Sequence, residues 1–272
     1  MAHLDCSFYS QTLKKNTRVI VFLPSLSADD FLSGHHVDYT RKGAKFQTLY
    51  LLHGSYGDCT DWSHLSNIER YAQEKCLAVV MPSGENSSYV NMARGEHYLD
   101  YIAWELPDFL SKLFPLSRKK ENTFIAGLSM GGYGAFRLAL EYPDAYAFAA
   151  SLSGALDRAA LQESKDAHIA KMPLNYRKAV FADLGRVHGS ENDLHVILDR
   201  RVSEKAALPK FYMTCGTEDF IYPCNVEFYE ALAKHSVDVT LQKHHGTHCW
   251  DFWDLHIQDV LNWLPLMHDV VD

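Results

Sequence analysis

Short runs of apolar residues alternate along this chain with longer segments in which apolar residues recur at helical spacing. The runs at residues 77–82, 123–127 and 210–216 are almost continuously apolar, which is typical of strands buried on both faces. Parallel strands need a crossover connection, and a helix usually provides it. The pattern therefore predicts an α/β fold with a mostly parallel central sheet and helices on both faces.

The same pattern gives the expected elements. Strands are expected at residues 18–24, 49–53, 77–82, 123–127, 147–152, 210–216 and 238–243. Helices are expected at residues 61–75, 98–114, 130–142, 193–205 and 249–264. Pro107 should kink or interrupt the second of these helices, because proline lacks the N–H that a helix interior requires.

Residues 155–208 depart from this pattern. They are richer in charge and contain no clear strand, so we expect a small cap-like insertion above the sheet. The chain shows no repeat, low-complexity segment or linker, and residues 1–272 are predicted to form a single domain.

Composition excludes several classes of function. The chain has 26 Lys and Arg against 34 Asp and Glu, a formal net charge of −8, whereas a nucleic-acid binder needs a basic surface. No run approaches the ~18 apolar residues of a membrane helix, and residues 1–16 lack the apolar core of a signal peptide. We expect a cytoplasmic protein without a membrane partner, and the sequence leaves a homo-oligomer open.

The six cysteines fit this setting. None are spaced as C-x-x-C, so we expect reduced packing residues, with a Cys215–Cys224 bridge as the minor alternative.

The strongest local signal is the pentapeptide Gly127-Leu128-Ser129-Met130-Gly131. A buried strand precedes it and a helix follows it, which is the context of a nucleophile elbow. In such a turn the serine hydroxyl stands above the sheet at a helix N-terminus, where developing negative charge is favoured. We therefore expect Ser129 to be a nucleophile.

A serine hydroxyl needs a base to take its proton, and the chain offers 15 histidines. His248 lies in the loop between the last expected strand and the last helix, at the strand-end position where sites form in such sheets. His244 and His245 lie in or next to the strand and are expected to be packing or surface residues. A metal cluster of these three is disfavoured, because no Cys or carboxylate stands at ligand spacing. We expect no metal and no cofactor.

The carboxylate partner of the histidine should follow the strand at residues 210–216. Two candidates stand there, Glu218 and Asp219, and Asp219 is preferred because a G-x-x-D loop after this strand commonly presents the acid. Glu218 remains the alternative. Asp251 and Asp254 follow His248 and so have the wrong chain order.

An oxyanion hole needs two backbone N–H groups. Met130, directly after the nucleophile, is expected to supply one, and Ser55 in the loop after the strand at residues 49–53 is expected to supply the other. Gly54 lets the backbone turn beneath the substrate. His53 is expected to brace this loop rather than to act as a second base.

Four segments carry a resemblance to a known family: LYLLHGSYGDCTDW, TFIAGLSMGGYGAFRLAL, CGTEDF and GTHCWDFW. The chain resembles the esterase D-type branch of the α/β-hydrolases and is similar within it to the bacterial tributyrin and acetyl esterases. The resemblance runs from the first strands to the final helix and is weakest at residues 155–208. It implies an α/β-hydrolase fold and a triad of Ser129, Asp219 and His248.

The resulting expectation is a serine carboxylesterase that hydrolyses short-chain acyl esters, such as acetyl and butyryl esters or tributyrin, through an acyl-enzyme intermediate. Tyr56 and Trp62 are candidates for walls of the acyl pocket, with loop packing as their other reading. The same branch contains S-formylglutathione hydrolases and feruloyl and acetyl xylan esterases, which stay alternatives. Formylglutathione hydrolases carry a cysteine close behind the glycine of the H-G loop, whereas Cys59 lies further along. An inactive binding module is the non-enzyme alternative.

Overall fold

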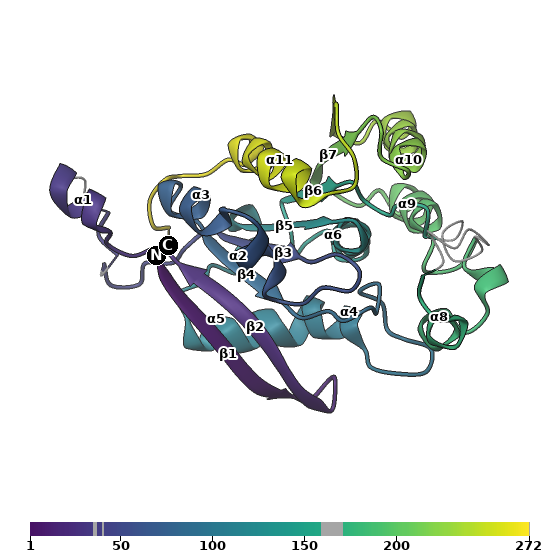
Figure 1. Ribbon diagram of the computed structural model, residues 1–272, viewed down its shortest axis with the longest axis horizontal. Coiled ribbons are helices and arrows are strands. Elements are labelled where there is room, and N and C mark those ends of the chain that lie inside the picture. The colour runs from purple at the N-terminus through teal and green to yellow at the C-terminus, as the bar shows by residue number, and fades with distance from the viewer. Residues whose placement is uncertain (35–36, 40, 159–170, 272) are drawn as a thin grey trace.

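The computed structural model describes residues 1–34, 37–39, 41–158 and 171–271, and a twisted eight-stranded sheet forms its centre (Figure 1). The strands lie in the order β1-β2-β4-β3-β5-β6-β7-β8. Strands β3 to β8 pair in parallel, and β1 and β2 add an antiparallel edge next to β4. The carboxyl ends of the parallel strands therefore meet at one edge of the sheet.

The strands are β1 (Ala2–Ser10), β2 (Lys15–Leu23), β3 (Thr48–Leu52), β4 (Ala78–Pro82), β5 (Thr123–Leu128), β6 (Phe148–Leu152), β7 (Lys210–Gly216) and β8 (Val239–His244). The helices are α1 (Ala28–Ser33), α2 (Asp61–Leu65), α3 (Ile68–Glu74), α4 (Tyr98–Asp100), α5 (Leu106–Leu113), α6 (Met130–Glu141), α8 (Leu174–Phe181), α9 (Leu194–Ser203), α10 (Tyr222–Lys234) and α11 (Trp250–Trp263). A π-helical turn spans Tyr101–Glu105, and short 3-10 turns span Lys120–Asn122 and Leu184–Arg186.

Side chains of the central strands alternate between two apolar cores, one on each face of the sheet. Phe124 and Ala126 of β5 belong to the core that α3 and α11 cover, and Ile125 belongs to the core that α5 and α6 cover. Strand β5 is buried along its whole length because helices cover both of its faces. This arrangement confirms the predicted α/β-hydrolase fold.

Each expected strand is present with small changes in its bounds, but β1 was not expected. Its apolar residues Leu4, Cys6 and Phe8 alternate with polar ones, and all three pack against the core that α5 and α6 cover. This alternation is the signature of an edge strand with one buried face, and it contrasts with the continuous apolar runs of the central strands.

Two expected helices are divided in the structure. The helix predicted at residues 61–75 breaks between α2 and α3, where the Asn67 backbone N–H donates to Asp254 Oδ1 at 2.7 Å and so binds the break to α11. The helix predicted at residues 98–114 widens into the π-helical turn just before Pro107, which lies in the first turn of α5. The helical backbone continues from the π-helical turn into α5, so the change in hydrogen-bond pattern lies directly before the residue that lacks an N–H donor.

Helix α10 was not expected, although the parallel pair β7 and β8 requires a crossover between them. Of the predicted insertion at residues 155–208, residues 159–170 lie outside the described residues. The described remainder contains α8 and α9 and no strand. Helix α9 packs against α6, where Arg200 pairs with Glu141 at 2.6 Å. The cap-like role of this segment and the single domain stay predictions.

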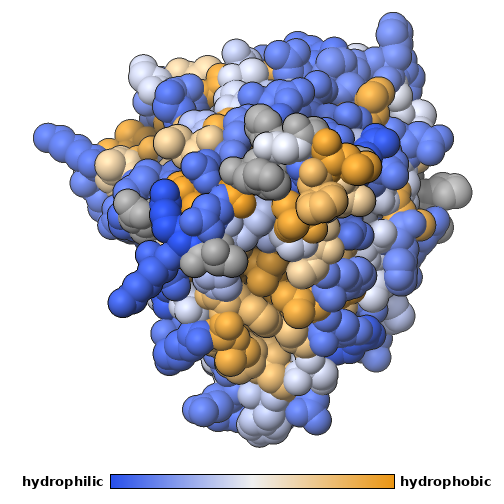
Figure 2. Space-filling model, turned by 90° about the vertical axis from the view of Figure 1, so that its left-hand side faces the viewer, coloured by the Kyte–Doolittle hydropathy of each residue, from blue (hydrophilic) through white to orange (hydrophobic). Residues whose placement is uncertain are grey.

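The surface carries apolar side chains on the face that holds α1 (Figure 2). Leu26, Phe31 and Leu32, on or beside this helix, are exposed. Within the described part of the chain, no helix combines the length and the apolar character that crossing a membrane requires. A homo-oligomer stays a prediction.

The close contact between β5 and α6 can be tested at Gly127. A Cβ atom at this position would lie 2.4 Å from the Gly131 carbonyl group, which is backbone and cannot rotate away. We predict that Gly127→Ala lowers the free energy of unfolding by about 1–3 kcal/mol, measured by urea denaturation. Gly185→Ala is the control, because its Cβ would meet its nearest neighbour at 3.6 Å. Equal midpoints for the two variants would contradict the predicted contact.

Candidate functional site

Ser129 stands at the turn between β5 and α6 with a backbone φ of 51°. A positive φ strains a residue that carries a Cβ, at a cost of about 1–3 kcal/mol. Two hydrogen bonds beside the end of β6 hold this conformation: the Ser129 N–H donates to Leu152 O, and the Ala155 N–H donates to Ser129 O, both at 2.9 Å. The serine is therefore fixed by its backbone at the carboxyl edge of the sheet.

The first turn of α6 lies directly against the end of β3. A Cβ atom on Gly131 would lie 2.5 Å from Leu52 O and 2.6 Å from His53 O, so only glycine allows this approach. The contact brings the helix N-terminus and Ser129 next to the loop that follows β3. Gly131 of the pentapeptide thus allows the Ser129 turn and the loop with Ser55 to lie next to each other.

His248 links Ser129 to Asp219. The Ser129 hydroxyl donates to His248 Nε2 at 2.9 Å, and His248 Nδ1–H donates to Asp219 Oδ2, also at 2.9 Å. The Asp219 side chain is fully buried, and its Oδ1 accepts a hydrogen bond from the Ile221 N–H at 3.1 Å. A buried carboxylate on Nδ1 favours the tautomer in which Nε2 can accept the serine proton.

Glu218, the alternative acid, points to a different partner. Its Oε2 accepts from the Gly246 N–H at 2.6 Å, and its Oε1 lies 2.9 Å from His245 Nδ1. The Gly246 N–H and His245 together lower the pKa of Glu218 to about 2. Glu218 N–H also donates to Gly246 O at 3.1 Å, so this residue ties the β7–α10 loop to the β8–α11 loop. Glu218 holds the loop that carries His248, but the hydrogen-bond partner of the His248 imidazole is Asp219.

The two expected amide donors are Ser55, in the loop after β3, and Met130, the first residue of α6. Neither the Ser55 N–H nor the Met130 N–H donates a hydrogen bond to any residue that the structure describes. The Ser55 loop is braced by His53, whose Nε2 accepts from the Gly84 N–H at 2.8 Å while its Nδ1 lies 2.7 Å from Gly54 O. His53 is buried, and burial lowers its pKa. Because its Nε2 accepts a hydrogen bond from the Gly84 N–H, this nitrogen carries no proton and the ring is neutral.

A cavity of about 270 Å³ opens beside Ser129 and His248. Its lining residues are Gly54, Ser55, Tyr56, Asp61, Leu128, Ser129, Ala155, Arg158, Lys171, Met172, Arg177, Phe220, Ile221, His248, Trp250 and Trp253. Tyr56, one of the two expected wall residues, is among them and is largely exposed.

Trp62, the other expected wall residue, does not line this cavity. It is buried, and its indole N–H donates to Leu52 O at 3.1 Å. Its ring lies edge-on to Trp250, 5.2 Å between centroids, and Trp250 in turn reaches the cavity. The expected wall role of Trp62 is thus corrected to a packing role behind the wall.

Several lining residues were not predicted as site residues. Trp253 lies edge-on to His248 at 4.9 Å, and Phe220 is tilted against the same imidazole at 4.9 Å. Trp250 and Trp253 occur in the GTHCWDFW segment, and their place directly after His248 was the available signal. Arg158 had no such signal: it follows the end of β6, but it lies in the segment expected to form an insertion, where no motif marks a site residue.

Two other features lie away from Ser129. A larger cavity, about 560 Å³, is lined by Trp104, Tyr142 and other residues but by none of Ser129, Asp219 and His248. Among the described residues, His244, His256 and Asp259 bring ligand atoms within 4.8 Å of one another, as a metal site would require. In this group His256 Nδ1 lies 2.7 Å from Asp259 Oδ2. His245 and His248 are not part of it.

The arrangement at Ser129 suits acyl transfer. A hydroxyl, an imidazole and a buried carboxylate form one hydrogen-bonded chain. Ser55 lines the same cavity as Ser129, and Met130 follows Ser129 directly in the chain. Hydrogen-bonded nucleophile, base and orienting group are the elements of nucleophilic catalysis.

Comparison with known proteins agrees with this chemistry. The Esterase family model, described as "Putative esterase", matches residues 10–264. An acetyl esterase from Caldicellulosiruptor saccharolyticus is 36% identical over 271 residues, which cover 99% of this chain and 100% of that protein.

Two solved structures from Staphylococcus aureus are similar over the whole chain. One is FphF, a fluorophosphonate-binding serine hydrolase, with a TM-score of 0.85 and 35% identity. The other is the S-formylglutathione hydrolase FrmB, with a TM-score of 0.82 and 34% identity. Each comparison covers 97% of this chain and 98% of the other.

The neutral state of His53 predicts a pH dependence of stability. Its pKa in the folded protein lies below the ordinary value of 6.5, so the unfolded chain binds a proton that the folded protein does not. The free energy of unfolding should therefore fall as the pH drops below about 6.5. We predict that His53→Gln, which keeps an acceptor for Gly84 but cannot titrate, weakens this dependence in urea denaturation across pH.

His64→Gln is the control for this measurement, because His64 is exposed. Its unfolding free energy should follow the wild-type pH dependence. An unaltered pH dependence in His53→Gln would show that His53 is not a buried neutral group.

Proposed function

The chain belongs to the Esterase family and is a carboxylic ester hydrolase, and from this premise we propose that Ser129, His248 and Asp219 are its catalytic triad. The observation that carries the proposal is the continuous hydrogen-bonded chain from Ser129 Oγ through His248 to the buried Asp219. The positive φ of Ser129 is consistent with it, because strained residues are enriched at active sites.

The geometry assigns each group a step. Ser129 Oγ attacks the ester carbonyl carbon while His248 Nε2 accepts the hydroxyl proton, and Asp219 stabilises the resulting imidazolium. The oxyanion of the tetrahedral intermediate accepts hydrogen bonds from the Ser55 and Met130 amides. When the C–O bond breaks, His248 returns the proton to the departing alcohol. Water then attacks the acyl-enzyme by the same route and releases the acid and free Ser129.

We infer that the substrates are short-chain acyl esters of the acetyl or butyryl type. A cavity of about 270 Å³ lies just below the size range of ordinary small-ligand pockets, which span roughly 300–1,000 Å³. Apolar residues, among them Ile221, Trp250 and Trp253, form much of its wall. The acetyl esterase relative supports the same substrate class. We propose that the enzyme also hydrolyses tributyrin, which is an ester of the butyryl type.

A thioesterase activity is the second candidate, and the likeness to FrmB, an S-formylglutathione hydrolase, favours it. The same triad would attack a thioester carbonyl, with a thiol as the leaving group. Cys59 is buried and does not line the cavity beside Ser129. Rates for S-formylglutathione and for matched oxygen esters, measured side by side, distinguish the two activities.

The nucleophile is tested by Ser129→Ala. We predict that this variant loses about 10⁴-fold or more of the kcat for p-nitrophenyl acetate, because no other group can form the acyl-enzyme. Circular dichroism should show an unchanged fold. Ser63→Ala, in α2 and outside the cavity lining, is the matched control and should keep its activity. Retained hydrolysis by Ser129→Ala would overturn the assignment.

The acid is tested by comparing its two candidates. Asp219→Asn should lower kcat by about 10⁴-fold, because the amide favours the wrong tautomer of His248. Glu218→Gln should stay close to wild type, because its amide oxygen can still accept from the Gly246 N–H. Steady-state kinetics with p-nitrophenyl acetate measure both. The opposite ranking would assign the acid role to Glu218.

A further inference from the structure

The cavity beside Ser129 is rich in cationic groups, although the chain as a whole has a net charge of −8. Three cationic residues line it: Arg158, Lys171 and Arg177. Among the described lining residues, Asp61 is the one that carries a carboxylate. Asp219 lies behind His248 and is hydrogen-bonded to it. A neutral ester requires no such concentration of positive charge.

Arg158 is the unusual member of this group because it is buried, with only 8% of its surface exposed. Its Nε and Nη2 both donate to Ser88 Oγ, at 3.0 and 2.8 Å. No carboxylate of the described residues lies within 4.0 Å of its guanidinium nitrogens, and Nη1 forms no hydrogen bond with those residues. Burial lowers the pKa of Arg158 to about 10, which leaves it charged at neutral pH.

A buried charge normally has a charged partner, because removing it from water costs several kcal/mol. A serine hydroxyl is a weak substitute, since it is neutral and here accepts from two guanidinium nitrogens at once. The guanidinium keeps N–H donors on Nη1 and Nη2 with the planar spacing that matches a carboxylate. The partner that fits this group is therefore an anion that enters from the cavity.

We propose that the ester substrate carries a second, ionised acid group, a carboxylate, and that Arg158 binds it inside the cavity. The inference rests on the proposed esterase function of Ser129 and specifies its substrate class. One buried cation matches one monoanion. Burial strengthens this pairing, because few water molecules compete with it.

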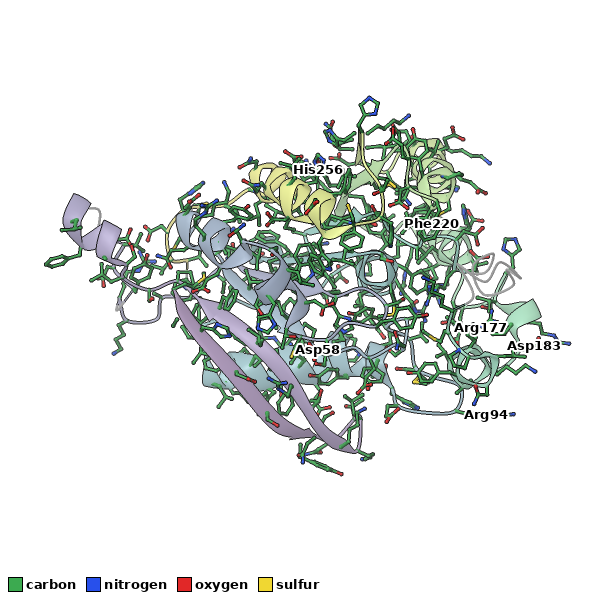
Figure 3. The ribbon with its side chains drawn as sticks, in the orientation of Figure 1. Asp58, Arg94, Arg177, Asp183, Phe220 and His256 are labelled. Atoms are coloured by element: carbon green, nitrogen blue, oxygen red, sulfur yellow. The ribbon has the colours of Figure 1, made fainter. Side chains whose placement is uncertain are left out.

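Lys171 and Arg177, the other two cationic residues of the cavity, extend its positive electrostatic potential toward the solvent. Lys171 is exposed, and Arg177 lies on α8, on the same side of the molecule as Phe220 of the β7–α10 loop (Figure 3). Cations that line a cleft raise the local concentration of an anionic substrate. We assign Arg158 the binding of the carboxylate, and Lys171 and Arg177 its attraction to the cavity.

The experiment uses pairs of esters that differ only in charge. Monomethyl glutarate and its amide analogue methyl glutaramate place the charge on the acyl side. Acetoxyacetate and acetoxyacetamide place it on the alcohol side. We predict that, in one of these pairs, the wild type hydrolyses the charged ester with a kcat/KM at least about tenfold higher, measured by pH-stat titration. The pair that shows the preference identifies the side of the ester that faces Arg158.

Arg158→Gln and Arg158→Met then test the residue. In both variants the ratio of charged to uncharged kcat/KM should fall by about tenfold or more. Arg70→Gln removes an exposed arginine of α3 outside the cavity and should keep the wild-type ratio. Ratios near one for both pairs in the wild type would overturn the proposal even if the variants did not fold. An unchanged ratio in folded Arg158 variants would also overturn it.

Failure of the proposed role of Ser129 gives a different result, because Ser129→Ala would then still hydrolyse the esters. Calorimetry with Ser129→Ala separates binding from chemistry. This variant should bind the charged ester of the preferred pair at least about tenfold more tightly than its amide, and adding Arg158→Gln should abolish the difference. Equal affinities would reject the anion site whatever the catalytic result.

Discussion

The arrangement of the site depends on the positive φ of Ser129, which is 51°. Ser129 follows β5 directly; its N–H donates to Leu152 O at the end of β6, and its C=O accepts from the Ala155 N–H. The first turn of α6 packs against the end of β3. The strain of about 1–3 kcal/mol is offset by these contacts, which involve neighbouring parallel strands. Because the carboxyl ends of those strands meet at one edge, the loops with the amide donors, the acid and the histidine gather around one hydroxyl.

Two buried charges near this hydroxyl differ in how they are neutralised. Asp219 has His248 and the Ile221 N–H as partners, whereas Arg158 has only the neutral Ser88 hydroxyl among the described residues. Asp219 is thus satisfied within the protein, and Arg158 is arranged for a partner from outside. Functional sites often keep such locally unfavourable groups at the expense of stability. The overall acidity of the chain gave no sign of this cationic cavity.

The proximity of Ser129, Asp219 and His248 could be predicted because each of the three signals is local. The elbow, the acid loop and the histidine loop each follow a buried strand, so these residues could be selected from strand ends and chain order. Features that depend on packing between distant segments could not be predicted. At the helix break, the Asn67 N–H donates to Asp254 of α11, and the buried Trp62 indole N–H donates to Leu52 O at the end of β3. The proximity of Arg158 to the cavity depends on tertiary structure in the same way.

Covalent labelling tests the central claim most directly, because only an activated serine reacts rapidly with a fluorophosphonate. The folded protein would be incubated with a fluorophosphonate, and the adduct located by peptide mass spectrometry. We predict one adduct per chain, on Ser129, with labelling strongly slowed in His248→Ala. An adduct on another serine, or labelling that does not depend on His248, would contradict it.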